Sequence, residues 1–228
     1  MKISENSRQV PKDKNILANK ESYHDIIYAY LQIISKWDGD KEHPRYVLKK
    51  DIVFSKISKI LGITRQTISK YFNRMIDNEE NQSKGYVRLI REQEDRYELV
   101  PLDRSLAMLV SQETLAVLVS ALNNNAISVF VYLLNRYLGS SEQSFIFTYE
   151  ELKGVIGLSK TTYSNDYIIS GILFVLEKLG LLQMNKKTEK TENGFRDVCV
   201  AIAMNNEVAK EVNVENSINP GLYKQLYS

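Results

Sequence analysis

The segment that most constrains the fold of this chain is residues 53–72, where two short apolar patterns flank a glycine. In the first pattern, apolar residues recur four, seven and eight positions after Val53, which predicts a short helix with one buried face. Gly62 follows at a position where a turn often needs a positive φ angle. The segment therefore predicts a helix, a glycine turn and a second helix. The apolar residues of the first helix are Val53, Ile57, Ile60 and Leu61.

The second predicted helix has two chemically different faces. Thr64 suits its N-cap position, because a threonine hydroxyl can accept a hydrogen bond from a free N–H of the first turn. Ser58 is small enough to let the two helices cross closely. Ile63 is apolar and is expected to pack into the core. The residues expected to face inward are Ile68, Tyr71, Phe72 and Met75, and those expected to face outward are Arg65, Gln66, Ser69, Lys70 and Asn73.

The outward face carries types of side chain that are suited to reading DNA bases. Arginine pairs with guanine through two hydrogen bonds and glutamine or asparagine pairs with adenine, each worth about 1–3 kcal/mol of discrimination. Thr67, Ser69 and Lys70 suit phosphates or bases, and a helix N-terminus itself attracts a phosphate. We therefore expect duplex DNA binding by Thr64, Arg65, Gln66, Thr67, Ser69, Lys70 and Asn73. The alternative is a solvated polar face on a helix that has only a structural role.

The surrounding residues complete a winged-helix pattern. A helix is expected over residues 22–37 and an extended segment over 45–50. Alternating apolar residues at 85–91 and 96–100 predict a hairpin, the wing. The wing arginines, Arg88, Arg91 and Arg96, are expected to follow the phosphate backbone or enter the minor groove.

The second half of the chain repeats this order with a period of about 100 residues. Ser111 is expected to cap a helix that ends at Leu122. The further expected elements are helices at 126–138, 149–156 and 159–179, strands at 145–148, 180–184 and 198–203, a turn at Gly157 and a polar hairpin tip at 185–197.

The second motif departs from the first at two core positions. When Gly157 is aligned with Gly62, Lys153 takes the place of a small residue and Asp166 takes the place of an apolar one. Its expected DNA-binding residues are Lys160, Thr161, Thr162 and Asn165, with Lys186 and Lys187 in a basic wing. The competing use is dimerisation or partner binding through the apolar helices 126–138 and 168–179.

The predicted fold class is mainly α with small β wings (α+β), arranged as two tandem winged helix-turn-helix domains. The expected parts are a flexible N-terminal arm (1–20), domain 1 (21–104), domain 2 (105–204) and a C-terminal tail (205–228). Residues 1–110 hold 20 Lys and Arg against 16 Asp and Glu, whereas residues 111–228 hold 10 against 12. The first domain is therefore expected to make more of the nucleic-acid contact.

The composition of the chain argues against several other classes of protein. A single cysteine, Cys199, excludes a multi-cysteine metal site, and the two histidines are not closely spaced. The chain has no glycine loop for phosphate binding, so we expect no enzyme, no catalytic residue, no metal and no cofactor. No apolar run reaches the roughly 18–20 residues of a membrane span, and no signal peptide is visible, so a cytoplasmic protein is expected.

Three segments, at residues 126–138, 147–160 and 176–182, resemble the winged-helix domains of plasmid and phage replication initiators of Gram-positive bacteria. With the first motif included, the resemblance extends over residues 22–203. It implies two recognition helices in successive major grooves of repeated origin sequences. It thereby implicates Arg65, Gln66, Ser69, Lys70 and Asn73, and in the second motif Lys160, Thr161, Thr162 and Asn165.

The leading hypothesis is sequence-specific double-stranded DNA binding by a replication initiator or accessory replication factor. One alternative is a transcriptional repressor with the same DNA chemistry. Another is an interaction module that recruits replication proteins. The expected partners are double-stranded DNA, a second copy in a homodimer, and replication or transcription proteins, with no membrane.

Overall fold

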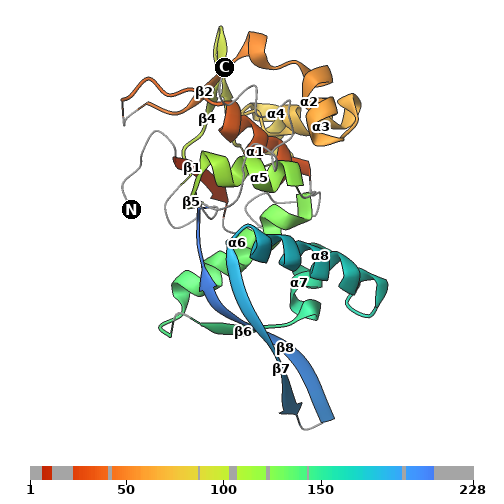
Figure 1. Ribbon diagram of the computed structural model, residues 1–228. Coiled ribbons are helices and arrows are strands. Elements are labelled where there is room, and N and C mark those ends of the chain that lie inside the picture. The colour runs from red at the N-terminus through yellow and green to blue at the C-terminus, as the bar shows by residue number, and fades with distance from the viewer. Residues whose placement is uncertain are drawn as a thin grey trace. The chain divides into compact units, whose positions relative to one another are not determined.

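The computed structural model describes residues 7–11, 23–40, 43–86, 88–102, 107–121, 124–142, 144–191 and 194–207. These residues form a mixed α+β protein of helices and small antiparallel sheets (Figure 1). They divide into two compact units between Ile127 and Ser128. That division lies later in the chain than the sequence-based boundary between residues 104 and 105.

The first unit contains the helices and strands expected around the first motif. Strands β2, β4 and β3 form an antiparallel sheet in that order, with Val47 opposite Tyr97 and Arg91 opposite Glu98. The elements are α1 (Tyr23–Ile34), β2 (Tyr46–Leu48), the 3-10 helix η2 (Lys49–Asp51), α2 (Phe54–Leu61), α3 (Arg65–Arg74), α4 (Glu79–Ser83), β3 (Ile90–Glu92) and β4 (Arg96–Leu99).

The wing differs from its prediction, because strand β3 begins at Ile90 and not at residue 85. The short helix α4 ends at Ser83, before residues 85–89, which were expected to belong to the strand. Its Asn81 is buried, and the side-chain amide donates to the backbone oxygens of Asn73 (2.7 Å) and Ile76 (2.8 Å). These hydrogen bonds tie α4 to the end of α3.

Residues 7–11 form a strand, so the prediction of a flexible arm is wrong for this segment. Strand β1 (Ser7–Pro11) pairs antiparallel with β5 (Ala107–Ser111), which lies in the expected linker. Arg8 is buried, and its Nε donates to the Gln32 backbone oxygen at 2.7 Å. A buried arginine masks the alternation of apolar and polar residues by which a strand is recognised in a sequence. The rest of the predicted arm lies outside the described residues.

Helix α5 (Gln112–Ala121) also belongs to the first unit, where it packs on α1. The hydroxyl of Ser111 accepts a hydrogen bond from the Thr114 backbone N–H at 3.1 Å, which confirms the predicted cap. The positions from Thr114 to Val119 are all buried, because α5 is contacted by α1, α2, β1 and β5.

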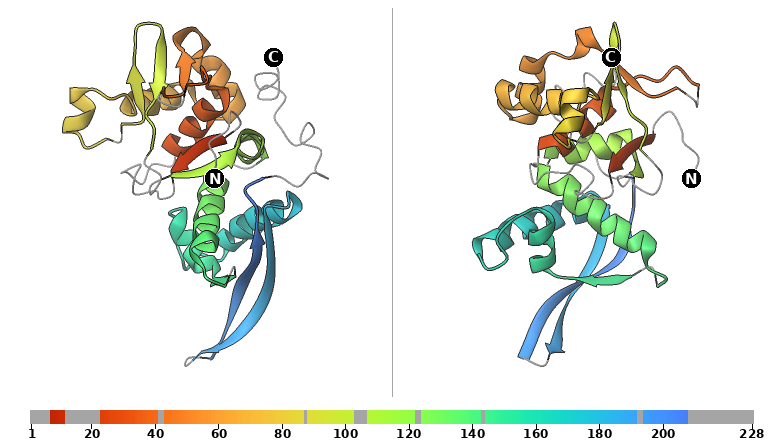
Figure 2. Two further views of the ribbon diagram at one scale, coloured as in Figure 1. Left: turned by 90° about the vertical axis from the view of Figure 1, so that its left-hand side faces the viewer. Right: turned by 180° about the vertical axis from the view of Figure 1, so that it is seen from behind.

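The second unit has its own sheet, with strand order β6-β8-β7. The hairpin is longer than expected, because residues 185–197 belong mostly to its two strands and do not form a polar tip. In all three ribbon views it extends away from the helices of this unit (Figures 1 and 2). The division lies within the first helix, α6 (Asn124–Gly139). The elements that follow it are β6 (Phe145–Phe147), α7 (Tyr149–Val155), α8 (Ser164–Lys178), β7 (Leu182–Thr191) and β8 (Gly194–Met204).

Helix α8 begins at Ser164, later than the predicted residue 159. Most of the predicted tail, residues 208–228, lies outside the described part of the chain. Among the described helices, none is both long enough and apolar enough to cross a membrane.

Candidate nucleic-acid interface

The turn between α2 and α3 has the predicted local geometry. Gly62 has a φ of 66°, a left-handed conformation that glycine adopts at little cost. The Thr64 hydroxyl accepts a hydrogen bond from the Thr67 backbone N–H at 3.3 Å, which confirms it as the N-cap of α3. The turn and the cap together fix where α3 starts and which residues lie in its first turn.

The predicted inward face of α3 is confirmed, since Ile68, Tyr71, Phe72 and Met75 are all buried. The Phe72 ring packs edge-on against Phe54, with centroids 5.5 Å apart, and against Tyr97 at 5.0 Å. The prediction for α2 is only partly right. Ile57 is buried, whereas the other three residues of its apolar pattern are half-buried. These are Val53, Ile60 and Leu61.

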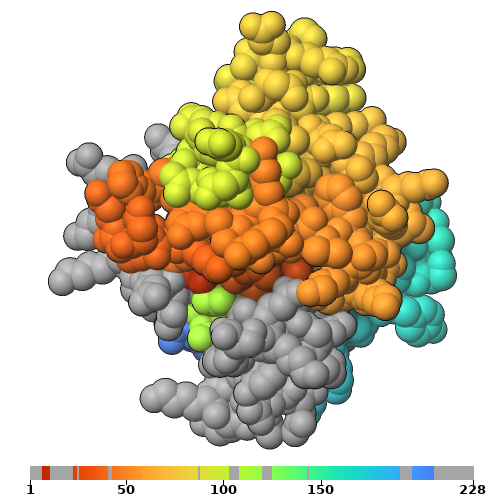
Figure 3. Space-filling model, turned by 90° about the horizontal axis from the view of Figure 1, so that it is seen from above, coloured from red at the N-terminus to blue at the C-terminus, as the bar shows by residue number. Residues whose placement is uncertain are grey.

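The opposite face of α3 is open to solvent. Arg65, Gln66, Lys70 and Asn73 are exposed, and Thr67 and Ser69 are partly exposed. The segment from α2 through α4 lies at the surface next to the β3–β4 hairpin (Figure 3). The arrangement presents hydrogen-bonding side chains on one side of a helix that is anchored by its other side.

Charge along this segment is of one sign. Residues 52–76 contain five basic side chains and no Asp or Glu. Arg74 lies over two aromatic rings, 5.3 Å from the centroid of Tyr71 and 5.0 Å from that of Tyr86. The Nζ of Lys70 lies 5.3 Å from the Tyr71 centroid. None of these contacts neutralises the positive charge, so the helix pair presents a basic surface. The five residues are Lys56, Lys59, Arg65, Lys70 and Arg74.

The wing offers less positive charge than its sequence suggests. Arg88 pairs with Asp77 at 3.6 Å, and Arg96 pairs with Glu98 at 3.3 Å. Arg91 is exposed. The turn of the hairpin carries Glu94 and Asp95, which repel phosphate, and Glu92, the last residue of β3, pairs with Lys49 at 2.7 Å. Contact between the wing arginines and the phosphate backbone of DNA therefore stays a prediction. The geometry favours α3 over the wing as the surface for such contact.

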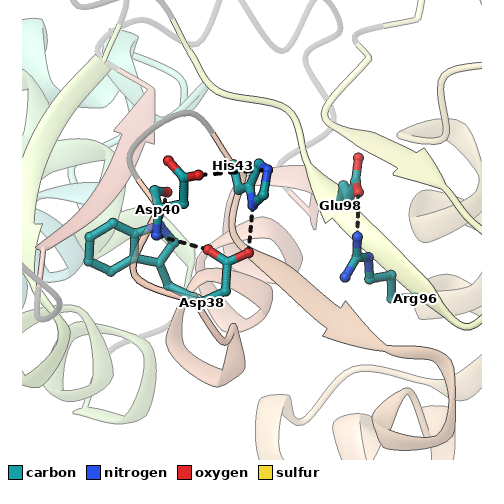
Figure 4. Close-up of polar contacts among 6 residues, drawn as sticks. Asp38, Asp40, His43, Arg96 and Glu98 are labelled. Atoms are coloured by element: carbon teal, nitrogen blue, oxygen red, sulfur yellow. Dashed lines mark hydrogen bonds and ion pairs between the residues drawn. The ribbon is translucent and has the colours of Figure 1, made fainter.

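The loop after α1 holds an exposed ion pair close to β4 (Figure 4). His43 Nδ1 lies 2.7 Å from Asp38 Oδ2, and His43 Nε2 lies 3.9 Å from Asp40 Oδ2. The hydrogen bond to Asp38 raises the pKa of His43, and the same contact lowers the pKa of Asp38. No cluster of three or more potential ligands that could hold a metal ion occurs within the described ranges.

In the second unit, the two unusual residues of the motif pair with each other. Lys153 is 2% exposed, and its Nζ lies 2.6 Å from Asp166 Oδ1. The same Nζ donates to the backbone oxygen of Lys160 at 3.0 Å. The ion pair joins α7 to α8, and the hydrogen bond to Lys160 holds the loop between them. The sequence showed both departures, and their opposite charges were the signal that they compensate each other.

The other end of α7 is fixed by a capping box. The Thr148 hydroxyl accepts from the Glu151 backbone N–H, and the Glu151 carboxylate accepts from the Thr148 N–H. Gly157 has a φ of 72°, which confirms the predicted turn.

The residues of this unit that were expected to bind DNA lie in two separate places. Lys160, Thr161 and Thr162 are exposed in the loop between α7 and α8. Asn165 is in the first turn of α8, where its side-chain amide donates to the Ser159 backbone oxygen at 3.0 Å. Lys186 and Lys187 lie within strand β7, not at the tip of the hairpin. The Nζ of Lys186 is 5.6 Å from the Tyr149 ring centroid, and Lys187 lines a shallow pocket with Arg136.

Helix α8 includes residues 168–178 of the segment expected as an alternative surface for dimerisation or partner binding, and its outer face carries exposed aromatic residues. Tyr163, just before the helix, and Tyr167 and Phe174 within it are exposed. No Lys or Arg occurs from Thr161 through Glu177. This face is therefore aromatic where the outer face of α3 is basic.

Comparisons of the chain with protein-family models, with curated proteins and with solved structures found no match.

Proposed function

We propose that this protein binds duplex DNA sequence-specifically, with α3 in the major groove. The observation that carries the proposal is the exposed face of α3, which presents Arg65, Gln66, Lys70 and Asn73 from a helix whose opposite face is buried. A helix that projects two side-chain amides, each able to donate and to accept a hydrogen bond, and a guanidinium that donates two, matches the hydrogen-bonding pattern of base edges. The absence of acidic residues from 52 to 76 favours approach to phosphates.

The proposal includes a finer fold assignment, in which both units are winged helix-turn-helix variants. Each unit has the order helix, strand, helix, glycine turn, helix and two-stranded hairpin. In each sheet the strand before the motif pairs with the second strand of the hairpin, which gives the orders β2-β4-β3 and β6-β8-β7. This matching strand order, together with positive φ angles at Gly62 and Gly157, supports a duplicated module.

The biological role is proposed from the sequence resemblance to replication initiators. An initiator or accessory replication factor would bind direct repeats at an origin, whereas a repressor with the same α3 chemistry would bind a site over a promoter. The target sequence distinguishes the two roles.

Selection from a random duplex library, followed by fluorescence anisotropy, tests DNA binding directly. The selected duplex should bind more tightly than a shuffled one, and affinity for both should fall as salt rises. Arg65→Ala should lower affinity for the selected duplex more than for the shuffled one. Lys84→Ala is a matched control, because Lys84 is an exposed basic residue just after α4 that pairs with Glu80. Failure to enrich any sequence at low salt would contradict the proposal.

A further inference from the structure

The exposed aromatic residues of α8 lie along one line of the helix. Tyr163 is 86% exposed, Tyr167 is 83% exposed and Phe174 is 58% exposed. Steps of four and seven residues return to the same side of an α-helix, so the three rings share one face, which we call the α8 aromatic face. Ser170 and Gly171 are exposed between Tyr167 and Phe174. The face therefore has aromatic residues on both sides of a small-residue centre.

This face has the chemistry of a protein interface. Tyrosine and phenylalanine are enriched in the buried centres of protein–protein contacts, where charged residues are depleted. Phosphate binding needs Lys or Arg, and none occurs from Thr161 through Glu177. These properties favour a protein partner over DNA.

The spacing of the face is complementary to a second copy of itself. A two-fold axis that passes between Ser170 and Gly171 would run two α8 helices antiparallel across each other. Tyr167 of one copy would then lie opposite Phe174 of the other, and Ser170 opposite Gly171. Tyr163 would lie opposite Lys178, whose Nζ is already 5.5 Å from the Phe174 ring centroid and so lies on the same side of the helix.

Each of these pairings is favourable. Aromatic rings stack on each other, an ammonium group is attracted to the face of a tyrosine ring, and small residues let helices approach closely. An isologous interface needs this kind of self-complementarity, because the same patch must fit itself. We propose that the protein forms a homodimer through antiparallel contact of the α8 aromatic faces. The proposal goes beyond DNA binding and does not depend on it.

Sedimentation velocity of the full chain over a wide range of concentration tests the dimer. The mass should rise from 26.3 kDa toward twice that value as concentration increases. Tyr167→Glu and Phe174→Glu should each weaken the dimer about tenfold or more, because each places two charges in the centre of the contact. Leu138→Glu is the matched control, since Leu138 is 69% exposed on α6, outside the aromatic face, and should leave the dimer unchanged.

Cysteine cross-linking tests the register of the contact without disturbing the aromatic residues. Ser170→Cys should form a disulfide-linked dimer under mild oxidation, because the two copies of this residue flank the two-fold axis. Ser83→Cys, on exposed α4, should not. Cys199 contributes little background, since it is buried and burial raises the pKa of its thiol.

Three outcomes would overturn the proposal. The first is a monomer at every concentration without cross-linking of Ser170→Cys. The second is a dimer that Tyr167→Glu and Phe174→Glu leave intact, which would place the contact elsewhere. The third is a loss of DNA affinity in these variants with no change in mass, which would make the α8 aromatic face a DNA-binding surface.

Discussion

Helices α3 and α8 occupy the same position in the element order of their units, yet they present opposite surfaces. Helix α3 carries three basic residues and no acidic residue, and its outer face is polar. Helix α8 carries one lysine, in its last turn, and its outer face holds Tyr167 and Phe174. A similar order of helices and strands therefore does not bring a similar surface with it. The residues on the free face decide what each helix can bind.

The two helix pairs are also joined in different ways. In the first unit, the half-buried Ser58 occupies the position where α2 and α3 are expected to cross, and aromatic packing of Phe54 on Phe72 adds to the contact. In the second unit, the aligned position holds Lys153, whose charge is balanced by Asp166. The Lys153 side chain is 2% exposed and that of Asp166 is 35% exposed, so the buried ammonium group depends on this one carboxylate for its counter-charge. The second unit should therefore be more sensitive to a single polar substitution.

The largest expected effect is on this ion pair. Asp166→Asn should destabilise the second unit by about 3 kcal/mol, because it leaves the ammonium group of Lys153 buried without a counter-charge. Urea unfolding followed by far-UV circular dichroism measures the loss. Trp37 is the only tryptophan and lies in the first unit, so its fluorescence reports that unit separately.

A double variant, Lys153→Met with Asp166→Leu, provides the control for this prediction. It removes both charges and should lose less stability than Asp166→Asn alone. If Asp166→Asn unfolds at the same urea concentration as the parent protein, the ion pair does not hold α7 against α8.

The next effect concerns the outer face of α3. Arg65→Ala should reduce affinity for a selected duplex by about 1–3 kcal/mol and relax the preference at one base pair. Tyr167→Ala on α8 should leave DNA affinity per protein chain unchanged, which sharpens the contrast between the two helices. Anisotropy titrations with selected and shuffled duplexes measure both. Equal losses on both duplexes for Arg65→Ala would show that this residue does not read a base.

The two glycine turns should respond alike. Gly62→Ala and Gly157→Ala should each cost about 1 kcal/mol, because both residues have a positive φ that an L-residue adopts with strain. No atom lies within 4 Å of an added Cβ at either site, so the cost is confined to the backbone. Thermal unfolding measures the two losses. A neutral result at one site and a loss at the other would break the equivalence of the turns.

The smallest effect is a pH response confined to the first unit, which holds both histidines. The pKa of His43 should lie above 6.5 and should fall toward that value in Asp38→Asn, because the main cause of the shift is the hydrogen bond to Asp38. The raised pKa means that this contact stabilises the fold at pH values below 6.5 and stops doing so as pH rises through the folded pKa.

The lowered pKa of Asp38 acts in the opposite sense, so the stabilisation is also lost when pH falls far enough to protonate this carboxylate. NMR titration of the His43 ring protons measures the shift. An unchanged His43 pKa in Asp38→Asn would mean that the contact does not persist in solution.

The sequence predicted the parts of the fold that depend on local signals. The helical period placed α1, α2 and α3, the glycines marked the turns, and Thr64 and Ser111 were recognised as caps because capping is decided within one helical turn. It could not predict that residues 7–11 pair with 107–111. Strand pairing between distant segments follows from burial on the folded protein, and the buried Arg8 conceals the apolar pattern.

The sequence by itself therefore determined which segments become helices and turns and which residues of α3 face outward. Only the tertiary structure decided which charged residues, distant in the sequence, pair with each other. It brought Lys153 to Asp166, and it gave Arg88 and Arg96 acidic partners. It also left Tyr163, Tyr167 and Phe174 uncovered. Periodicity reports that a residue suits a buried face, but whether another element covers that face depends on packing between segments that no local pattern encodes.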